Sequence, residues 1–175
     1  MLRRVDYKRA EFVPEHVELT FDVQSREEVR VRAHITLRRA EGGETPVKKV
    51  RLHAGDNLKK GRGGDRIIAS PADDGTLAGW QWAGDEVECD AELSSGESCT
   101  VGLQTVLNPS KNNSGNGLYA SGAMLTALCE SQGFRCIAPM VDRPDVRPRW
   151  TTTLIADPTE FPVCLANGTM IREDT

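Results

Sequence analysis

Residues 17–23 read VELTFDV and residues 29–37 read VRVRAHITL, and in both stretches the apolar residues occupy the odd-numbered positions. Charged, imidazole or hydroxyl side chains fill the positions between them. A period of two places alternate side chains on opposite faces of a β-strand. The intervening residues 24–28 are all polar and are enough for a short connection. The pattern therefore predicts an antiparallel hairpin whose odd-numbered face is buried.

Strand-like patterns continue along the chain, at residues 47–52, 87–93, 99–107 and 149–156. Residues 122–132 are ambiguous, because their Ala, Met and Leu residues favour a helix while their spacing also allows a strand. Residues 162–165 suggest a last strand, and Asn167-Gly168 after it is a strong hairpin signal. Only residues 169–175 follow, so the return strand is expected to be missing. The chain is predicted to be an all-β domain with little helix.

Composition narrows the class of protein. The chain has 175 residues, which fits a single domain over residues 1–175, and its net charge is -4. A chain without a concentrated basic face is not expected to bind nucleic acid. No stretch approaches the ~20 apolar residues that cross a bilayer, and no signal peptide is visible. Five cysteines, an odd number without C-x-x-C spacing, favour a reduced, cytoplasmic protein without membrane contact.

Catalytic and metal-binding motifs are not found in the sequence. The three histidines, His16, His34 and His53, lie far apart and form no H-E-x-x-H pair. No G-x-S-x-G elbow is present, and Cys129 beside Glu130 is expected to have a disfavoured thiolate. These observations predict no catalytic residue, no metal site and no cofactor in this chain.

Several stretches together resemble one enzyme family: NPSKNNSGNGLYASG at 108–122, CE at 129–130, GFR at 133–135, DRPDV at 142–146 and TTTLIAD at 151–157. In this order they are similar to bacterial-type aminopeptidase N, a family of zinc aminopeptidases. The resemblance implies the N-terminal β domain, a saddle-shaped antiparallel β-sandwich of twisted sheets that leans on the catalytic domain. It also implies that residues 122–132 are extended.

The family's zinc-binding part is expected to be absent. Its G-x-M-E-N loop and its H-E-x-x-H helix lie beyond the point where this chain stops, so zinc belongs to a missing catalytic domain. The resemblance implies that the last strands of the β domain are missing as well. We expect the chain alone not to hydrolyse peptides.

The resemblance assigns a functional role to Glu130. It matches the family's glutamate that accepts hydrogen bonds from the free α-ammonium of the substrate, so the predicted partner is a peptide N-terminus. Two positions earlier the family has a glutamine that also faces this amine, and here the residue is Leu128. Since leucine cannot accept a hydrogen bond, this departure weakens amine recognition or reflects its loss.

The DRPD stretch at 142–145 is expected to be structural. Pro144 fixes a turn, and Arg143 can pair with a carboxylate on either side of it.

Two functions stay open at this point. The chain is a substrate-anchoring domain or fragment of a zinc metalloaminopeptidase, partnered by its catalytic domain, or it is a stand-alone, non-catalytic module that binds peptide N-termini or a protein partner. A third alternative is a degenerate β-sandwich that has lost its function and binds no partner. An H-E-x-x-H motif encoded after Thr175 would favour the enzyme, and a stop codon would favour the module. An open edge at residues 162–165 predicts weak self-association.

Overall fold

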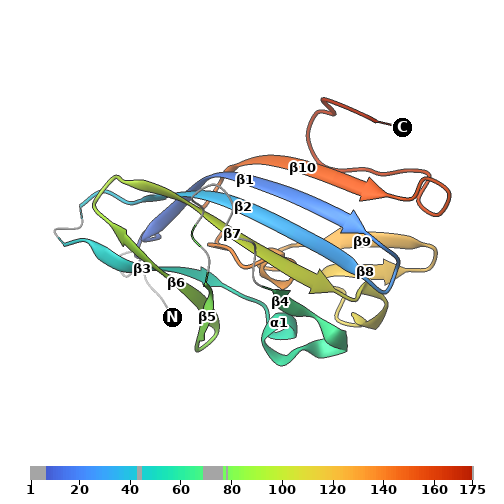
Figure 1. The fold of residues 1–175 in the computed structure, drawn as a ribbon, viewed down its shortest axis with the longest axis horizontal. Helices are drawn as coiled ribbons and strands as arrows, with labels where there is room; N and C mark the ends of the chain where they lie inside the picture. The colour runs from blue at the N-terminus through green and yellow to red at the C-terminus, as the bar shows by residue number, and fades with distance from the viewer. Residues whose placement is uncertain (1–6, 43–44, 69–76, 78, 175) are drawn as a thin grey trace.

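A five-stranded sheet dominates the fold (Figure 1). The computed structural model describes residues 7–42, 45–68, 77 and 79–174. The order across this sheet is β10-β1-β2-β7-β4. Its strands are β1 (Phe12–Val23), β2 (Val29–Arg39), β4 (Arg66–Ile68), β7 (Ser98–Leu107) and β10 (Arg149–Ala156). The all-β prediction is confirmed.

The predicted hairpin is present in the expected register. β1 pairs antiparallel with β2, and Val23 faces Val29 across the connection. Val17 and Leu19 on β1, and Val31 and Ile35 on β2, are buried, whereas the residues between them reach solvent. The odd-numbered face is therefore the core face, as the alternation predicted.

One strand pair departs from the antiparallel expectation. β10 lies parallel to β1, with Val17 opposite Trp150 and Phe21 opposite Leu154. A parallel pair requires a crossover between its strands, and here the crossover contains nearly all of the fold. β10 thereby becomes one edge of the large sheet.

A second, three-stranded sheet shares the core of the first. Its order is β3-β6-β5, with β3 (Val47–His53), β5 (Gln81–Ala83) and β6 (Glu86–Leu93). Val50 pairs with Cys89 and Leu52 with Val87, and all four side chains are buried. They belong to the same apolar cluster as the inner face of the large sheet. The apolar faces of the two sheets thus pack together and form one hydrophobic core.

Residues 122–132 hold no helix. β8 (Gly117–Ser121) and β9 (Met124–Leu128) form a separate antiparallel hairpin, which confirms the extended conformation for residues 124–128. Helical segments are short: α1 (Asp56–Lys60) and the 3-10 turns Arg62–Gly64, Pro109–Lys111 and Phe134–Cys136. No helix in the described part of the chain is long and apolar enough to span a membrane.

The prediction of a last strand at residues 162–165 is wrong. Residues 161–166 have no strand conformation, and Asn167-Gly168 forms only a bend. Pro162 has no backbone N–H, and the neighbouring side chains Val163 and Leu165 are exposed, so little stabilises a strand here. The open edge expected at these residues lies at β10 instead.

Candidate functional site

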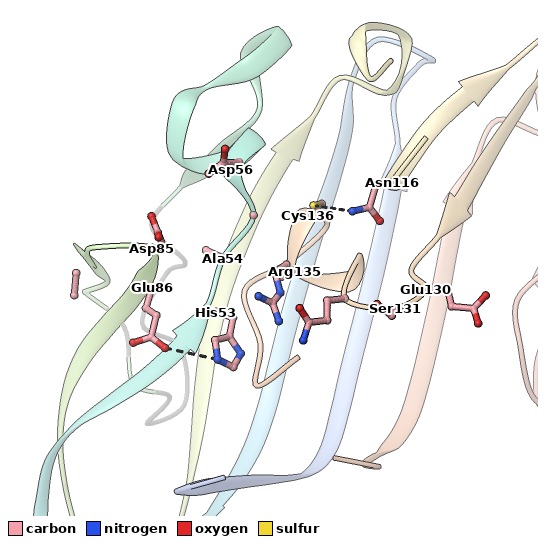
Figure 2. Close-up of a pocket in the computed structure, with 13 residues that line it drawn as sticks. His53, Ala54, Asp56, Asp85, Glu86, Asn116, Glu130, Ser131, Arg135 and Cys136 are labelled. Atoms are coloured by element: carbon pink, nitrogen blue, oxygen red, sulfur yellow. Dashed lines mark hydrogen bonds and ion pairs between the residues drawn. The ribbon is translucent and has the colours of Figure 1, made fainter. Parts of the chain in front are cut away.

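A concave cavity of about 810 Å³ joins segments that are far apart in the sequence (Figure 2). It lies where β3, the turn before β6 and the loop after β9 meet. Its lining residues are His53, Ala54, Gly55, Asp56, Ala83, Asp85, Glu86, Asn116, Glu130, Ser131, Gln132, Arg135 and Cys136. The residue for which the sequence predicts a function, Glu130, is among them.

Glu130 lies on the rim of this cavity. It follows β9 in a turn, and its side chain is exposed. In Figure 2 its carboxylate points away from His53 and Arg135. Within the described residues, the Glu130 carboxylate takes part in no ion pair or side-chain hydrogen bond. Its oxygens are therefore free to accept hydrogen bonds from a ligand.

Leu128 does not line the cavity. It is the last residue of β9, where it pairs with Gly117, and its side chain is exposed. The resemblance implies that residues 122–132 are extended, and in one continuous strand Leu128 and Glu130, two positions apart, would point to the same side. Because β9 ends at Leu128, the period of two does not extend to Glu130, and that part of the prediction is wrong.

Close backbone packing holds the loop after β9 in place. A Cβ on Gly133 would lie 2.0 Å from Oδ1 of Asn116 and 2.9 Å from both Cα of Cys129 and the carbonyl oxygen of Leu128. On the other side of the cavity, a Cβ on Gly55 would lie 2.8 Å from Cα of Cys136. Only glycine fits at both positions, so the segment from Cys129 to Cys136 is fixed between β8 and the start of α1.

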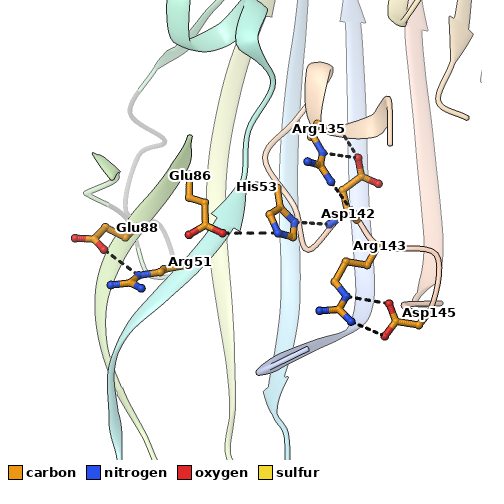
Figure 3. Close-up of polar contacts among 8 residues, drawn as sticks. All are labelled: Arg51, His53, Glu86, Glu88, Arg135, Asp142, Arg143 and Asp145. Atoms are coloured by element: carbon orange, nitrogen blue, oxygen red, sulfur yellow. Dashed lines mark hydrogen bonds and ion pairs between the residues drawn. The ribbon is translucent and has the colours of Figure 1, made fainter. Parts of the chain in front are cut away.

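His53 connects two walls of the cavity (Figure 3). The backbone N–H of Asp142 donates to its Nδ1 at 3.2 Å, and its Nε2 lies 3.7 Å from a carboxylate oxygen of Glu86. Burial lowers the pKa of His53, and the positive charge of Arg135 lowers it further. Since Nδ1 accepts a hydrogen bond, the ring is in the neutral form with its proton on Nε2.

The charges around the cavity favour a cationic ligand. Of the charged lining residues, Asp56, Asp85, Glu86 and Glu130 are acidic and Arg135 is basic. Three of these groups are already paired: Arg135 with Asp142, Asp56 with Lys60 and Asp85 with Lys59. Glu86 faces the neutral His53, and Glu130 has no partner among the described residues, so these two carboxylates leave negative charge in a concave surface. The cavity is therefore suited to an ammonium group.

The cysteines near the cavity are not activated. Burial, together with the nearby Asp142 carboxylate, raises the pKa of Cys129 to about 11. The predicted disfavoured thiolate is confirmed, although burial and Asp142 cause it rather than Glu130. The pKa of Cys136 is also raised, mainly by burial. Neither thiol is suited to nucleophilic catalysis.

The described residues do not fit a zinc centre. Over residues 7–42, 45–68, 77 and 79–174, no three His, Cys, Asp or Glu side chains lie together in a group that could hold a metal ion.

The DRPD turn is structural, as predicted. Arg143 donates from Nε and from a terminal nitrogen to the carboxylate of Asp145, and its terminal nitrogen also donates to the carbonyl of Lys8 at 2.8 Å. The hydroxyl of Tyr7 donates to Asp145. The turn thus fastens the N-terminal segment to the domain.

Sequence reasoning missed His53 and Glu86. Both lie before residue 108, outside the stretches that carry the family resemblance, and the sequence shows His53 only as one of three histidines that lie far apart. Its hydrogen-bond partner Asp142 lies in a different motif. Arg135 belongs to the GFR motif, but the sequence contains no indication that it pairs with Asp142.

No protein-family model matches the chain. Curated relatives named aminopeptidase N do match it: the Escherichia coli protein is 30% identical over 97% of this chain, and the Caulobacter vibrioides protein is 30% identical over 93%. The Haemophilus influenzae protein is 39% identical over 53% of this chain. The chain spans 18%, 17% and 11% of these proteins, respectively.

Solved structures show the same fold. Aminopeptidase A of Legionella pneumophila, in complex with aspartic acid, superposes with a TM-score of 0.77 and 21% identity over 96% of this chain and 19% of that chain. A mutant M1 zinc metallopeptidase from Deinococcus radiodurans, bound to a Tyr-Ser-Ala substrate, gives 0.61 and 18% identity over 82% of this chain and 32% of that chain.

Proposed function

Because this chain belongs to the aminopeptidase N family and matches the N-terminal β domain of those enzymes, we propose that it anchors the amino end of a peptide substrate for a zinc-dependent aminopeptidase. In this proposal Glu130 accepts hydrogen bonds from the free α-ammonium of the peptide. One observation supports the proposal. The Glu130 carboxylate is exposed on the rim of an acidic cavity and has no partner among the described residues.

The chemistry of the anchor follows from charge and position. Hydrogen bonds between an ammonium and a carboxylate are about twice as strong as those between neutral groups. Fixing the amino end also fixes which peptide bond lies over a catalytic group, so that only one residue is removed at a time. A peptide whose amine is acetylated lacks the positive charge and cannot bind in this way.

Leu128 supplies no acceptor to this anchor. The family's glutamine at this position has an amide oxygen, whereas leucine has none. In this chain Leu128 also lies outside the cavity, so Leu128→Gln is expected to change the binding of a free peptide amine little.

NMR titration of the 175-residue chain with a tripeptide tests this function. A free-amine tripeptide should bind at the cavity, and its N-acetylated form should not. Because hydrogen bonds to charged groups contribute about 1.5–3 kcal/mol, Glu130→Gln should weaken binding by about tenfold or more. Glu92→Gln, which removes an exposed glutamate of β6 outside the cavity, is the matched control. Equal binding by Glu130→Gln, or by the acetylated peptide, would refute the proposal.

The catalytic step belongs to another domain in this proposal. Relatives of this chain are zinc metallopeptidases, and the cavity face described here would lie against the domain that holds their zinc. The coding sequence after Thr175 distinguishes this arrangement from a stand-alone module that binds peptide N-termini or a protein partner. The free state of all five thiols supports a reducing, cytoplasmic setting.

A further inference from the structure

Hydrogen bonds through Arg135 hold the loop that carries Glu130. We call residues 129–136 the anchor loop. Nε of Arg135 donates to Oδ2 of Asp142 at 3.1 Å, and the carbonyl of Arg135 accepts from the backbone N–H of Gly55 at 2.8 Å. The position of the anchor loop thus depends on where Asp142 and Gly55 lie.

His53 controls both of these contact points. It is the last residue of β3, and Gly55 follows it by two residues. Its backbone N–H donates to the carbonyl of Met140 at 2.9 Å, and its carbonyl accepts from the N–H of Met140 at 3.0 Å. Nδ1 of its ring then accepts from the N–H of Asp142 (Figure 3). The hydrogen bonds therefore form a closed circuit from the His53 ring to the anchor loop and back to the end of β3.

This circuit requires a neutral His53 ring. A protonated imidazole carries a hydrogen on both nitrogens and accepts no hydrogen bond. The N–H of Asp142 would then face an N–H of the ring, and the hydrogen bond between them would be lost. The cationic ring is attracted instead to the Glu86 carboxylate, which lies 3.7 Å from Nε2 on the side away from Asp142. The ring therefore has two arrangements, one that supports Asp142 and one that favours Glu86.

The surroundings of the ring favour the neutral arrangement. Burial is the main cause that lowers the pKa of His53. Among the described residues, Arg135 of the anchor loop and Arg143 of the DRPD turn also oppose a charge on the ring. Glu86 at the start of β6 and the carboxylate of Asp142 act in the opposite direction. Charging the ring thus requires a pH below the ordinary pKa of histidine, about 6.5.

A charged ring opposes a cationic ligand in two ways. The N–H of Asp142 loses its acceptor, so the anchor loop loses one of its supports. The new positive charge also compensates that of Glu86, so that Glu130 is left as the one unpaired carboxylate of the cavity among the described residues, because Asp56 and Asp85 are already paired with lysines. Both effects weaken the binding of an ammonium group.

We propose that His53 is a positioning residue and a pH-sensitive switch of the amine site: the neutral ring holds the anchor loop in place for Glu130, and the protonated ring releases it. This inference rests on the proposed function, because it names what regulates the same site. Linkage makes the coupling reciprocal, so a ligand that prefers the neutral form must lower the affinity of His53 for protons.

NMR titration of the 175-residue chain with a free-amine tripeptide at about pH 7 and about pH 5 tests the switch. The α-amine of the peptide is mainly protonated throughout this range, so the charge of the ligand does not cause a loss of affinity. Affinity should fall by about fivefold or more at the lower pH. Saturation with the tripeptide should lower the pKa of His53 by the logarithm of the limiting affinity ratio, about 0.7 for a fivefold ratio.

Three variants isolate the role of the ring. His53→Asn keeps an acceptor beside the N–H of Asp142 but cannot be charged, so its affinity should no longer fall with pH. His53→Ala has no acceptor and should bind the tripeptide more weakly than His53→Asn at about pH 7. His34→Asn removes an exposed histidine of β2 outside the cavity and is the matched control, which should keep the pH dependence of the unmodified chain.

The outcomes separate this inference from the proposed function. The switch is overturned if affinity is the same at both pH values, if the fall in affinity persists in His53→Asn, or if the tripeptide leaves the imidazole titration unchanged. Each of these results leaves Glu130 as the anchor. A tripeptide that binds at neither pH would instead refute the anchoring function, and the switch with it.

Discussion

Arg135 holds Asp142 by both its backbone and its side chain. The backbone N–H and Nε of Arg135 each donate to Oδ2 of Asp142 at 3.1 Å, and a terminal nitrogen donates to the Asp142 carbonyl at 2.6 Å (Figure 3). The two side chains are 23% and 13% exposed. This pair ties the loop that carries Glu130 to the turn that fastens the N-terminal segment.

Replacing Asp142 should therefore destabilise the domain. The substitution Asp142→Ala leaves the half-buried Arg135 guanidinium without its carboxylate, and the loss of a charged hydrogen-bond partner costs about 1–3 kcal/mol. Urea unfolding measures the change in the free energy of unfolding. The pair Arg172–Asp174 is the control, because its side chains are 78% and 69% exposed and Asp174→Ala should change stability little. Equal effects of the two substitutions would contradict a structural role for the pair.

Gly133→Ala should destabilise the folded domain because there is no room for the added Cβ. The backbone φ at Gly133 is -85°, which alanine adopts readily, so the added Cβ acts only through its contacts with Asn116, Cys129 and Leu128. Overpacking of this kind costs about 1–3 kcal/mol. Adding Asn116→Ala should restore only part of this loss, because the two backbone contacts remain. A neutral Gly133→Ala in thermal unfolding would show that the loop moves aside easily.

The stability of the chain should depend on His53 between about pH 7 and pH 5. Its pKa is lowered in the folded state, mainly by burial and Arg135, although Glu86 and Asp142 act in the opposite direction and Arg143 adds to the lowering. As the pH falls below the unfolded pKa, the unfolded chain binds the proton first, and the native state loses stability. His53→Gln should flatten this part of the curve, and NMR titration of the imidazole should give a pKa below about 6.5.

Asp145 should control stability at lower pH. Hydrogen bonds from Arg143 and Tyr7 lower its pKa to about 2. A carboxyl with a lowered pKa stabilises the native state above its unfolded pKa, and this contribution is lost as the pH falls toward the folded value. Asp145→Asn should therefore lose stability at pH 7, and the difference from the unmodified chain should shrink between about pH 4 and pH 2. A difference that is constant with pH would exclude this mechanism.

The sequence predicted best where one face of a strand is buried by many neighbours. At Val17, Leu19, Val31 and Ile35 the alternation determines both the strand and its inward face, because a slip by one residue would expose all of them. The strand prediction failed at residues 162–165, where propensity indicated a strand but none of the described residues pairs with them. Local preference is weak without tertiary contacts.

The candidate site was predictable only in part. Glu130 was found through the motif around it, whereas His53 and Glu86 were not found. Their roles arise from contacts between β3, β6 and the turn at Asp142, and no local pattern encodes such contacts. The position of Glu130 beyond the end of β9 also depends on the packing of Gly133, which strand periodicity does not describe.

The parallel pairing of β1 with β10 has a consequence for the order of folding. β1 leaves the ribosome long before its partner strand, which begins only at Arg149. Contacts between segments so distant in sequence form slowly, because closing a long loop costs entropy before any pairing is gained. Throughout most of synthesis, the edge of β1 that β10 later covers stays open to other chains. The nascent chain is therefore most vulnerable to wrong pairing, and most in need of a chaperone, just before β10 emerges.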